Sequence, residues 1–188
     1  SNVDWSQRIV DIDVRELPDS MLVFALIAMC EAARNQMYAN FERGVRTWIY
    51  IEEIQSLFQY PAVLNYFSRF ANEARKFGGI VTGITQSSTA MLESREARDL
   101  VLNADYIVLL KQSALDRERW VDFLDLSAQE EGCFDDGADR GCGLLVAGGA
   151  RVPIRGGFPR GNALYELFST DPNEAAERAA GKGRGHGA

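Results

Sequence analysis

The sequence predicts an α/β fold with a mostly parallel sheet that ends in an antiparallel hairpin. Short runs of β-branched and aromatic residues alternate with longer helical segments, which is typical of parallel βαβ units. Further along, two β-rich runs are separated only by Gly148-Gly149, and a two-residue glycine link between such runs favours a hairpin.

The first quarter of the chain predicts a strand, a long helix and a second strand. We expect the first strand over Arg8–Val14. Segment 17–20 offers an N-cap for an apolar-rich helix over Met21–Glu42, and Arg43-Gly44 ends that helix. The second strand is expected over Arg46–Ile51.

The same order then repeats. A helix over Pro61–Phe77 leads into a strand over Ile80–Thr85, and short helical pieces follow within Ser87–Leu102. The next strand, Asp105–Lys111, has a continuous apolar centre that predicts burial on both faces. A helix over Ala114–Leu124 follows it.

The C-terminal region predicts the hairpin and then a tail. The hairpin strands are expected over Gly143–Ala147 and Ala150–Arg155. We place one domain at residues 8–174 and a tail at 175–188. A short helix is expected over Glu174–Ala180, and the glycine-rich end beyond it is predicted to be disordered.

Composition narrows the classes of protein that the chain fits. Its 188 residues, 46% of them hydrophobic, suit one domain with a sizeable core. The net charge of −7 argues against a broad surface that binds nucleic acid, although it leaves a local contact open. The longest apolar run, Met21–Cys30, is shorter than the roughly 20 residues that span a bilayer, so no transmembrane segment is expected.

Cysteine and histidine usage also limits the chemistry. The three cysteines lack C-x-x-C spacing, so neither a disulfide framework nor a zinc site is predicted, and a reducing cytoplasm is the expected compartment. The single histidine, His186, lies in the tail, so catalysis would use carboxylates, amides and cations. Asp135, Asp136 and Asp139 lack the spacing of a calcium loop and are expected to form a solvated turn.

Polar side chains follow two successive predicted strands where each strand ends. Glu52 and Glu53 come directly after Arg46–Ile51, in a pattern that looks like a Walker B strand, and Gln86 follows Ile80–Thr85. The carboxyl ends of parallel strands lie at one edge of a sheet, where such sheets bind ligands, so we expect these side chains to converge there. Two alternatives stay open: the acids as ordinary first-turn helix residues, and the amide as a turn cap.

Five segments, in this order and spacing, resemble the C-terminal half of the VirB-type ATPases of conjugation and type IV secretion. The resemblance covers about residues 8–174. The segments are 48–54, 75–80, 82–86, 109–113 with Asp116-Arg117, and 164–168.

The resemblance implies a three-layer RecA-like P-loop NTPase core that uses ATP and Mg²⁺. It also implies a motor, often a hexamer, that energises assembly of a conjugation or secretion channel or transfer through it. The expected partners are therefore further copies of the chain and channel proteins. The expected location is the cytoplasm, at the inner face of the cell membrane.

The resemblance also implies roles for the polar residues at the strand ends. Glu53 becomes the catalytic carboxylate that orients or activates water, and Gln86 the sensor of the γ-phosphate. Glu52 stands where the family usually has an aspartate that acts on Mg²⁺ through its water shell. Its extra methylene moves the carboxylate by roughly a bond length, which matters because Mg²⁺ demands near-ideal octahedral geometry.

Three cations match family positions for binding the nucleotide. Arg75 and Lys76 form a basic pair that could reach the nucleotide of a neighbouring subunit. The alternative is that they only complement the C-terminal end of a helix dipole. Arg117 is a candidate arginine finger, and the alternative is a solvated arginine like Arg119 nearby.

One motif of the family does not occur in the sequence. The phosphate-binding pattern G-x-x-x-x-G-K-[ST] is missing, and Gly181-Lys182 has neither the upstream glycine nor the following hydroxyl. Because the family's P-loop precedes the matched region, we expect the chain to be a C-terminal fragment of a longer ATPase and to be inactive alone. Two other functions stay open: a non-catalytic RecA-fold assembly module, and part of a related hexameric DNA translocase.

Overall fold

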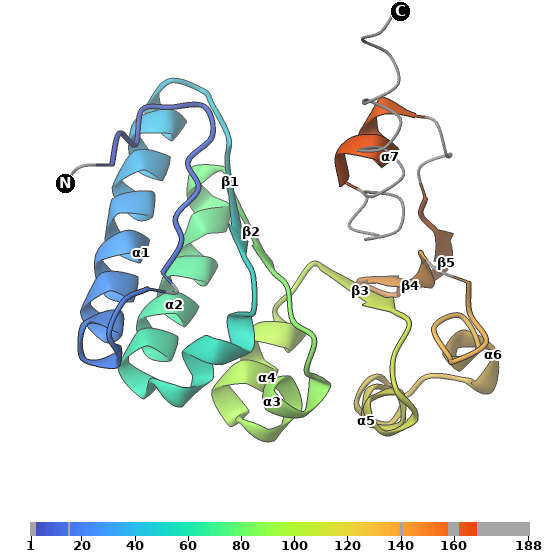
Figure 1. Ribbon diagram of the computed structural model, residues 1–188. Coiled ribbons are helices and arrows are strands. Elements are labelled where there is room, and N and C mark those ends of the chain that lie inside the picture. The colour runs from blue at the N-terminus through green and yellow to red at the C-terminus, as the bar shows by residue number, and fades with distance from the viewer. Residues whose placement is uncertain (1–2, 15, 140, 158–161, 169–188) are drawn as a thin grey trace, which may run out of the picture.

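The computed structural model describes residues 3–14, 16–139, 141–157 and 162–168, and its strands form two separate sheets (Figure 1). One sheet is a parallel pair and the other contains three antiparallel strands. The strands are β1 (Thr47–Ile51) and β2 (Gly79–Gly83) in the first sheet, and β3 (Tyr106–Leu110), β4 (Cys142–Ala147) and β5 (Ala150–Arg155) in the second.

Two long helices cover one face of the parallel pair (Figure 1). Helix α1 (Asp19–Glu42) begins after Pro18 and is followed at Gly44 by a residue with a left-handed φ of 70°. Helix α2 (Pro61–Ala74) has proline at its first position, where the missing N–H costs no helical hydrogen bond. The two helices pack against each other and against the strands, so they form a layer beside the sheet.

The pairing of β1 with β2 runs from Thr47 opposite Gly79 to Ile51 opposite Gly83. A Cβ on Gly79 would crowd the Met37 sulfur of α1 and Ala74 of α2, so glycine allows the start of β2 to pack closely against both helices. The side chains of Trp48 and Tyr50 stack on each other and are 59% and 61% exposed.

Shorter helices join the strands or follow the last of them. They are the 3₁₀ helices η1 (Ile54–Gln59) and η2 (Arg75–Phe77), and the α-helices α3 (Ser88–Glu93), α4 (Arg95–Leu102), α5 (Ala114–Leu124), α6 (Ala128–Glu131) and α7 (Ala163–Phe168). Serine side chains cap α3, α4, α5 and α6 by accepting a hydrogen bond from a first-turn N–H. These caps explain why each helix begins where it does.

The antiparallel sheet is built around the Gly148-Gly149 turn. Strand β4 pairs with β5 across this turn and with β3 on its other side. Gly148 has a φ of 57°, which suits a residue without a Cβ. Trp120 of α5 is buried in the same apolar cluster as Leu109 of β3 and Leu144 of β4.

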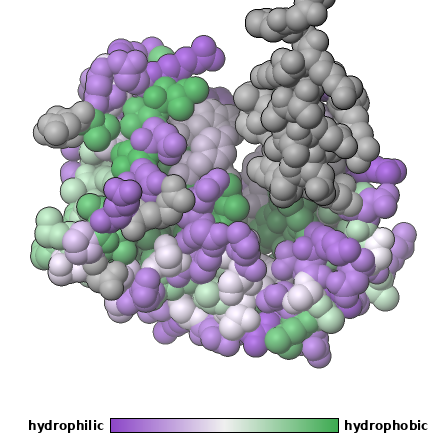
Figure 2. Space-filling model, viewed as in Figure 1, coloured by the Kyte–Doolittle hydropathy of each residue, from purple (hydrophilic) through white to green (hydrophobic). Residues whose placement is uncertain are grey.

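A single apolar cluster extends across both sheets. Its most deeply buried large side chains are Phe67, Phe134, Met37, Leu144 and Val63. Other apolar side chains are left exposed, and Figure 2 shows hydrophobic surface interleaved with hydrophilic surface on the face in view. Among the described helices, none combines the length and the apolar content needed to cross a membrane.

Most predicted elements are confirmed with shifts of one or two residues at their ends. The long helix starts at Asp19 instead of Met21, and the helix at 61–77 finishes as 3₁₀ helix η2. The hairpin and the helix at 114–124 occur as predicted. The predicted tail helix at 174–180 and the glycine-rich end lie outside the described residues.

Three predictions about the sheet were wrong in the described residues. Segment 8–14 is not a strand, because its backbone has no neighbouring strand with which to pair. The sheet is not mostly parallel: β3 pairs with β4 instead of β2, since alternation of strands and helices does not specify which strands become neighbours. Strand β3 is buried on one face only, and Tyr106 is 71% exposed.

We expect Phe67→Ala to lower the free energy of unfolding by about 3–5 kcal/mol, because it leaves a cavity in the core. The ring of Phe67 is 1% exposed and belongs to the cluster that joins both sheets. Urea unfolding followed by circular dichroism measures the loss. Phe24→Ala is the matched control, since the Phe24 side chain is 73% exposed, and equal losses in the two variants would contradict this account of the core.

Candidate functional site

The candidate site lies at the carboxyl edge of the parallel pair. Glu52 and Glu53 directly follow β1, and Gln86 comes three residues after β2. Two backbone hydrogen bonds continue the ladder past the strand ends: Ile84 N–H donates to the Ile51 carbonyl at 2.9 Å, and Ile54 N–H donates to the Ile84 carbonyl at 3.0 Å. These bonds hold the two connecting loops side by side.

The carboxylate of Glu53 accepts hydrogen bonds from two side-chain amides. Gln86 Nε2 donates to Glu53 Oε1 at 2.7 Å, and Gln55 Nε2 donates to Oε2. The backbone of Glu53 is left-handed, with a φ of 49° and a ψ of 46°. A non-glycine residue in this region costs on the order of 1 kcal/mol or more, and such outliers cluster at functional sites. The sequence prediction that Glu53 and Gln86 come together is therefore met by a direct contact.

Glu52 is exposed, and its carboxylate has no hydrogen bond or ion pair with any residue that the structure describes. It stands beside Glu53 at the end of β1. An exposed carboxylate without a protein partner is free to contact a solvated cation. The three predicted site residues Glu52, Glu53 and Gln86 thus share one edge, and two of them touch.

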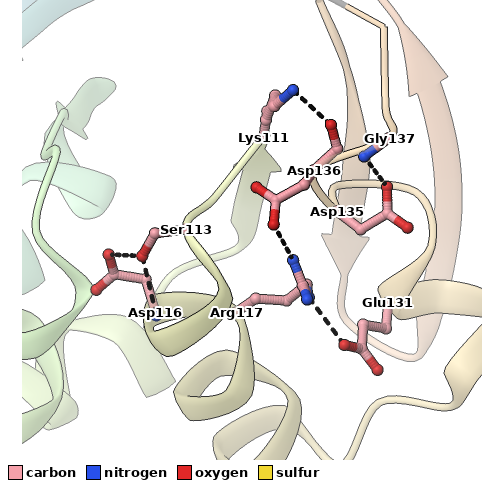
Figure 3. Close-up of polar contacts among 8 residues, drawn as sticks. All are labelled: Lys111, Ser113, Asp116, Arg117, Glu131, Asp135, Asp136 and Gly137. Atoms are coloured by element: carbon pink, nitrogen blue, oxygen red, sulfur yellow. Dashed lines mark hydrogen bonds and ion pairs between the residues drawn. The ribbon is translucent and has the colours of Figure 1, made fainter.

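A second polar cluster ties this edge to the antiparallel sheet. Ser88, which is 2% exposed at the start of α3, donates from Oγ to Asp116 Oδ1 at the start of α5. Ser113 donates from Oγ to Asp116 Oδ2 at 2.7 Å and accepts from the Asp116 N–H (Figure 3). The hydrogen bonds from Ser88 and then Ser113 hold the pKa of Asp116 below its ordinary value. The loops after β2 and β3 therefore meet at Asp116.

Arg117 points away from this cluster toward α6 and the segment that follows it (Figure 3). Its Nε donates to Glu131 Oε1 at 2.9 Å, and its NH1 donates to Asp136 Oδ2 at 3.4 Å. The bond with Glu131, and to a lesser degree the one with Asp136, raises the pKa of Arg117. The guanidinium proposed from sequence as a finger thus has two carboxylate partners within its own chain.

Arg75 and Lys76 lie at the opposite end of the parallel pair. They form part of η2, directly before β2, whereas Glu53 follows β1. Five strand residues separate the two ends, which corresponds to roughly 16 Å. Arg75 forms an ion pair with Asp105, and both side chains are exposed. The structure therefore does not bring this basic pair to the acidic edge of the same chain.

Sequence reasoning missed Gln55, Ser88 and the role of Asp116. Ser113 and Asp116 form an S-x-x-D pattern before a helical segment, which is a recognisable capping signal. For Ser88 the sequence carries no such signal, because its partner is 28 positions away. Gln55 lies two positions after Glu53, and the two side chains come into contact because the backbone turns at Glu53.

The donor set at the acidic edge fits Mg²⁺ bound mainly through water and phosphate. No group of three or more histidine, cysteine, aspartate or glutamate side chains that could hold a metal occurs among the described residues. Mg²⁺ in phosphoryl-transfer sites commonly takes only one or two carboxylates and completes its shell with water and phosphate oxygens. Glu52 and Glu53 supply that number of carboxylates.

Parallel strands that deliver adjacent carboxylates and an amide to one edge are typical of nucleotide-hydrolysing α/β proteins. No family model and no curated protein matches the sequence. Among solved structures, the chain is similar to VirB4 of Thermoanaerobacter pseudethanolicus, with a TM-score of 0.61 and 26% sequence identity. The match covers 79% of this chain and 41% of that VirB4 chain, so the chain spans less than half of its length. The resemblance to a VirB-type ATPase is thereby confirmed.

We expect the stability advantage of the wild type over Asp116→Asn to be full near pH 6 and to shrink below about pH 4. The pKa of Asp116 is lowered in the folded chain, so its contribution is present above the unfolded-state pKa and is lost as the pH falls through the folded-state pKa. Urea unfolding at pH 6 and pH 3 measures the change.

Ser88→Ala serves as the companion variant in this experiment. It removes the hydrogen bond that does most to lower the pKa of Asp116, so it should remove part of the same pH dependence. An advantage of wild type over Asp116→Asn that is equal at both pH values would contradict this account.

Proposed function

We propose that the chain is the C-terminal part of the ATPase domain of a motor that energises a type IV secretion or conjugation channel. The contact between Glu53 and Gln86 at the carboxyl edge of a parallel pair, in a fold similar to VirB4, supports this proposal. The activity, substrates and partners of the whole protein all belong to this proposal.

Each polar residue at the edge has a proposed role. Glu53, whose backbone is left-handed and whose carboxylate contacts Gln86, orients or activates the attacking water. Glu52 holds Mg²⁺ through the water shell, and Gln86 senses the γ-phosphate while hydrogen-bonded to Glu53. Bound Mg²⁺ would neutralise the charge that develops on the phosphate oxygens.

In the proposed hexamer, Arg75 and Lys76 could contact the nucleotide of a neighbouring subunit. Because they lie roughly 16 Å from the acidic edge, they could contact only a nucleotide bound by another subunit. Lys76 is exposed and makes no ion pair within the described residues, so its ammonium is available for such a contact. The Asp105 partner of Arg75 would have to be displaced first.

We propose a complete RecA-like core that includes a strand from the remainder of the parent protein. Isolated pairs of parallel strands are rarely stable, and parallel sheets are usually covered on both faces. The Ile84 N–H and the Gly78 carbonyl form hydrogen bonds with backbone groups of β1. Successive residues of a strand direct their backbone groups to opposite sides, so the N–H and carbonyl groups of Val81 and Gly83 point toward the other edge of β2. That edge is unpaired in the described residues and suits a strand leading into the P-loop.

A non-catalytic assembly module is the second candidate function. It is favoured by Glu52 in place of the usual aspartate and by the exposed aromatic pair Trp48 and Tyr50, which could contact another protein. A DNA translocase is disfavoured by the net charge of −7. For the secretion motor and for the DNA translocase alike, the proposed location is the cytoplasm, at the inner face of the membrane, next to channel proteins.

We expect Glu53→Gln in the parent protein with its P-loop to reduce ATP hydrolysis by on the order of a hundredfold or more, while ATP still binds. The amide keeps the shape and the contact with Gln86 but cannot act as a base. A coupled phosphate-release assay measures the rate, and fluorescent nucleotide titration measures binding.

Two reference proteins make this experiment decisive. Glu118→Gln changes an exposed glutamate of α5 and should hydrolyse ATP at the wild-type rate. The 188-residue chain alone, which lacks the P-loop motif, should show no hydrolysis. Wild-type hydrolysis by Glu53→Gln would rule out the catalytic role, and a parent protein without any P-loop would favour the assembly module.

A further inference from the structure

Arg117 is largely buried and forms two ion pairs within the chain. Its side chain is 18% exposed, and its two partners, Glu131 and Asp136, come from different segments. Glu131 is the last residue of α6, and Asp136 lies in segment 132–139 beyond it. One guanidinium on α5 thus bridges a helix end and the segment that follows it (Figure 3).

The same segment is anchored at further points at the carboxyl end of β3. The Phe134 side chain is 0% exposed, and the Phe134 carbonyl accepts the Gln112 N–H at 3.0 Å. Lys111 Nζ donates to the Asp136 carbonyl at 2.6 Å (Figure 3). Two cations, Lys111 and Arg117, therefore hold Asp136 from its backbone and from its side chain.

We propose that Arg117 is a positioning residue that fixes segment 132–139 against α5 at the end of β3, instead of a cation that binds nucleotide. This inference does not depend on the proposed ATPase function. To reach a phosphate, the guanidinium would have to leave both carboxylates, and neither has another cationic side chain as its partner among the described residues.

Arg119 provides the contrast within the same helix. Its side chain is 34% exposed and, within the described part of the chain, has one carboxylate partner, Glu93, at 3.4 Å. It lies two residues from Arg117 but contacts α3 and not segment 132–139. A change at Arg119 removes the same charge from α5 without touching the segment, so it is the matched control.

The test is amide hydrogen exchange in the 188-residue chain, measured by NMR for Arg117→Gln and Arg119→Gln. Arg117→Gln should accelerate exchange severalfold at Gln112 and Phe134, whose amides lie where the segment meets β3 and α6. Exchange at Ile84, directly after β2 of the other sheet, should not change. Arg119→Gln should leave Gln112 and Phe134 at their wild-type rates.

Arg117→Lys adds a rescue measurement. A single ammonium cannot donate from two separated nitrogens as a guanidinium does, so it should restore protection at Gln112 only in part. Unchanged exchange in Arg117→Gln would overturn the proposal. So would an equal rise at Ile84, which would indicate general destabilisation, or an equal effect of Arg119→Gln.

Discussion

The parallel pairing of β1 with β2 determines which polar side chains can meet at the candidate site. It sets both strands to end at the same level, and the hydrogen bonds of Ile84 and Ile54 carry that pairing into the loops beyond. Glu53 and Gln86 therefore meet although 33 positions separate them in the chain. The same pairing sends Arg75 and Lys76 to the far edge, so the acidic and basic candidates are separated by the length of the strands.

The two sheets are joined through side chains and helices, because no strand of one pairs with a strand of the other within the described residues. At the carboxyl edge the link is Ser88 with Asp116, and at the amino edge it is Arg75 with Asp105. Helices α3 and α5, which carry Ser88 and Asp116, also pack against each other. Asp116 thus contacts α3 through Ser88, while its neighbour Arg117 holds segment 132–139, so adjacent residues of one helix serve two regions.

The sequence allowed prediction of elements whose signals are local. Proline at position 61, the glycine pair at 148–149 and the apolar run of β1 each specify their own structure without distant partners. The contact of Glu53 with Gln86 was also predictable, because parallel strands end at one edge. The partner of β3, the left-handed turn at Glu53 and the two carboxylates around Arg117 were not, since each depends on tertiary neighbours.

In the proposed parent protein, β2 is an inner strand of a RecA-like core. Amide hydrogen exchange at Val81 and Gly83 tests this placement, because their N–H groups face the edge of β2 that has no partner strand among the described residues. We expect fast exchange at both amides in the 188-residue chain and strong protection in a longer protein that includes the P-loop region. Equal exchange in both proteins would contradict this placement.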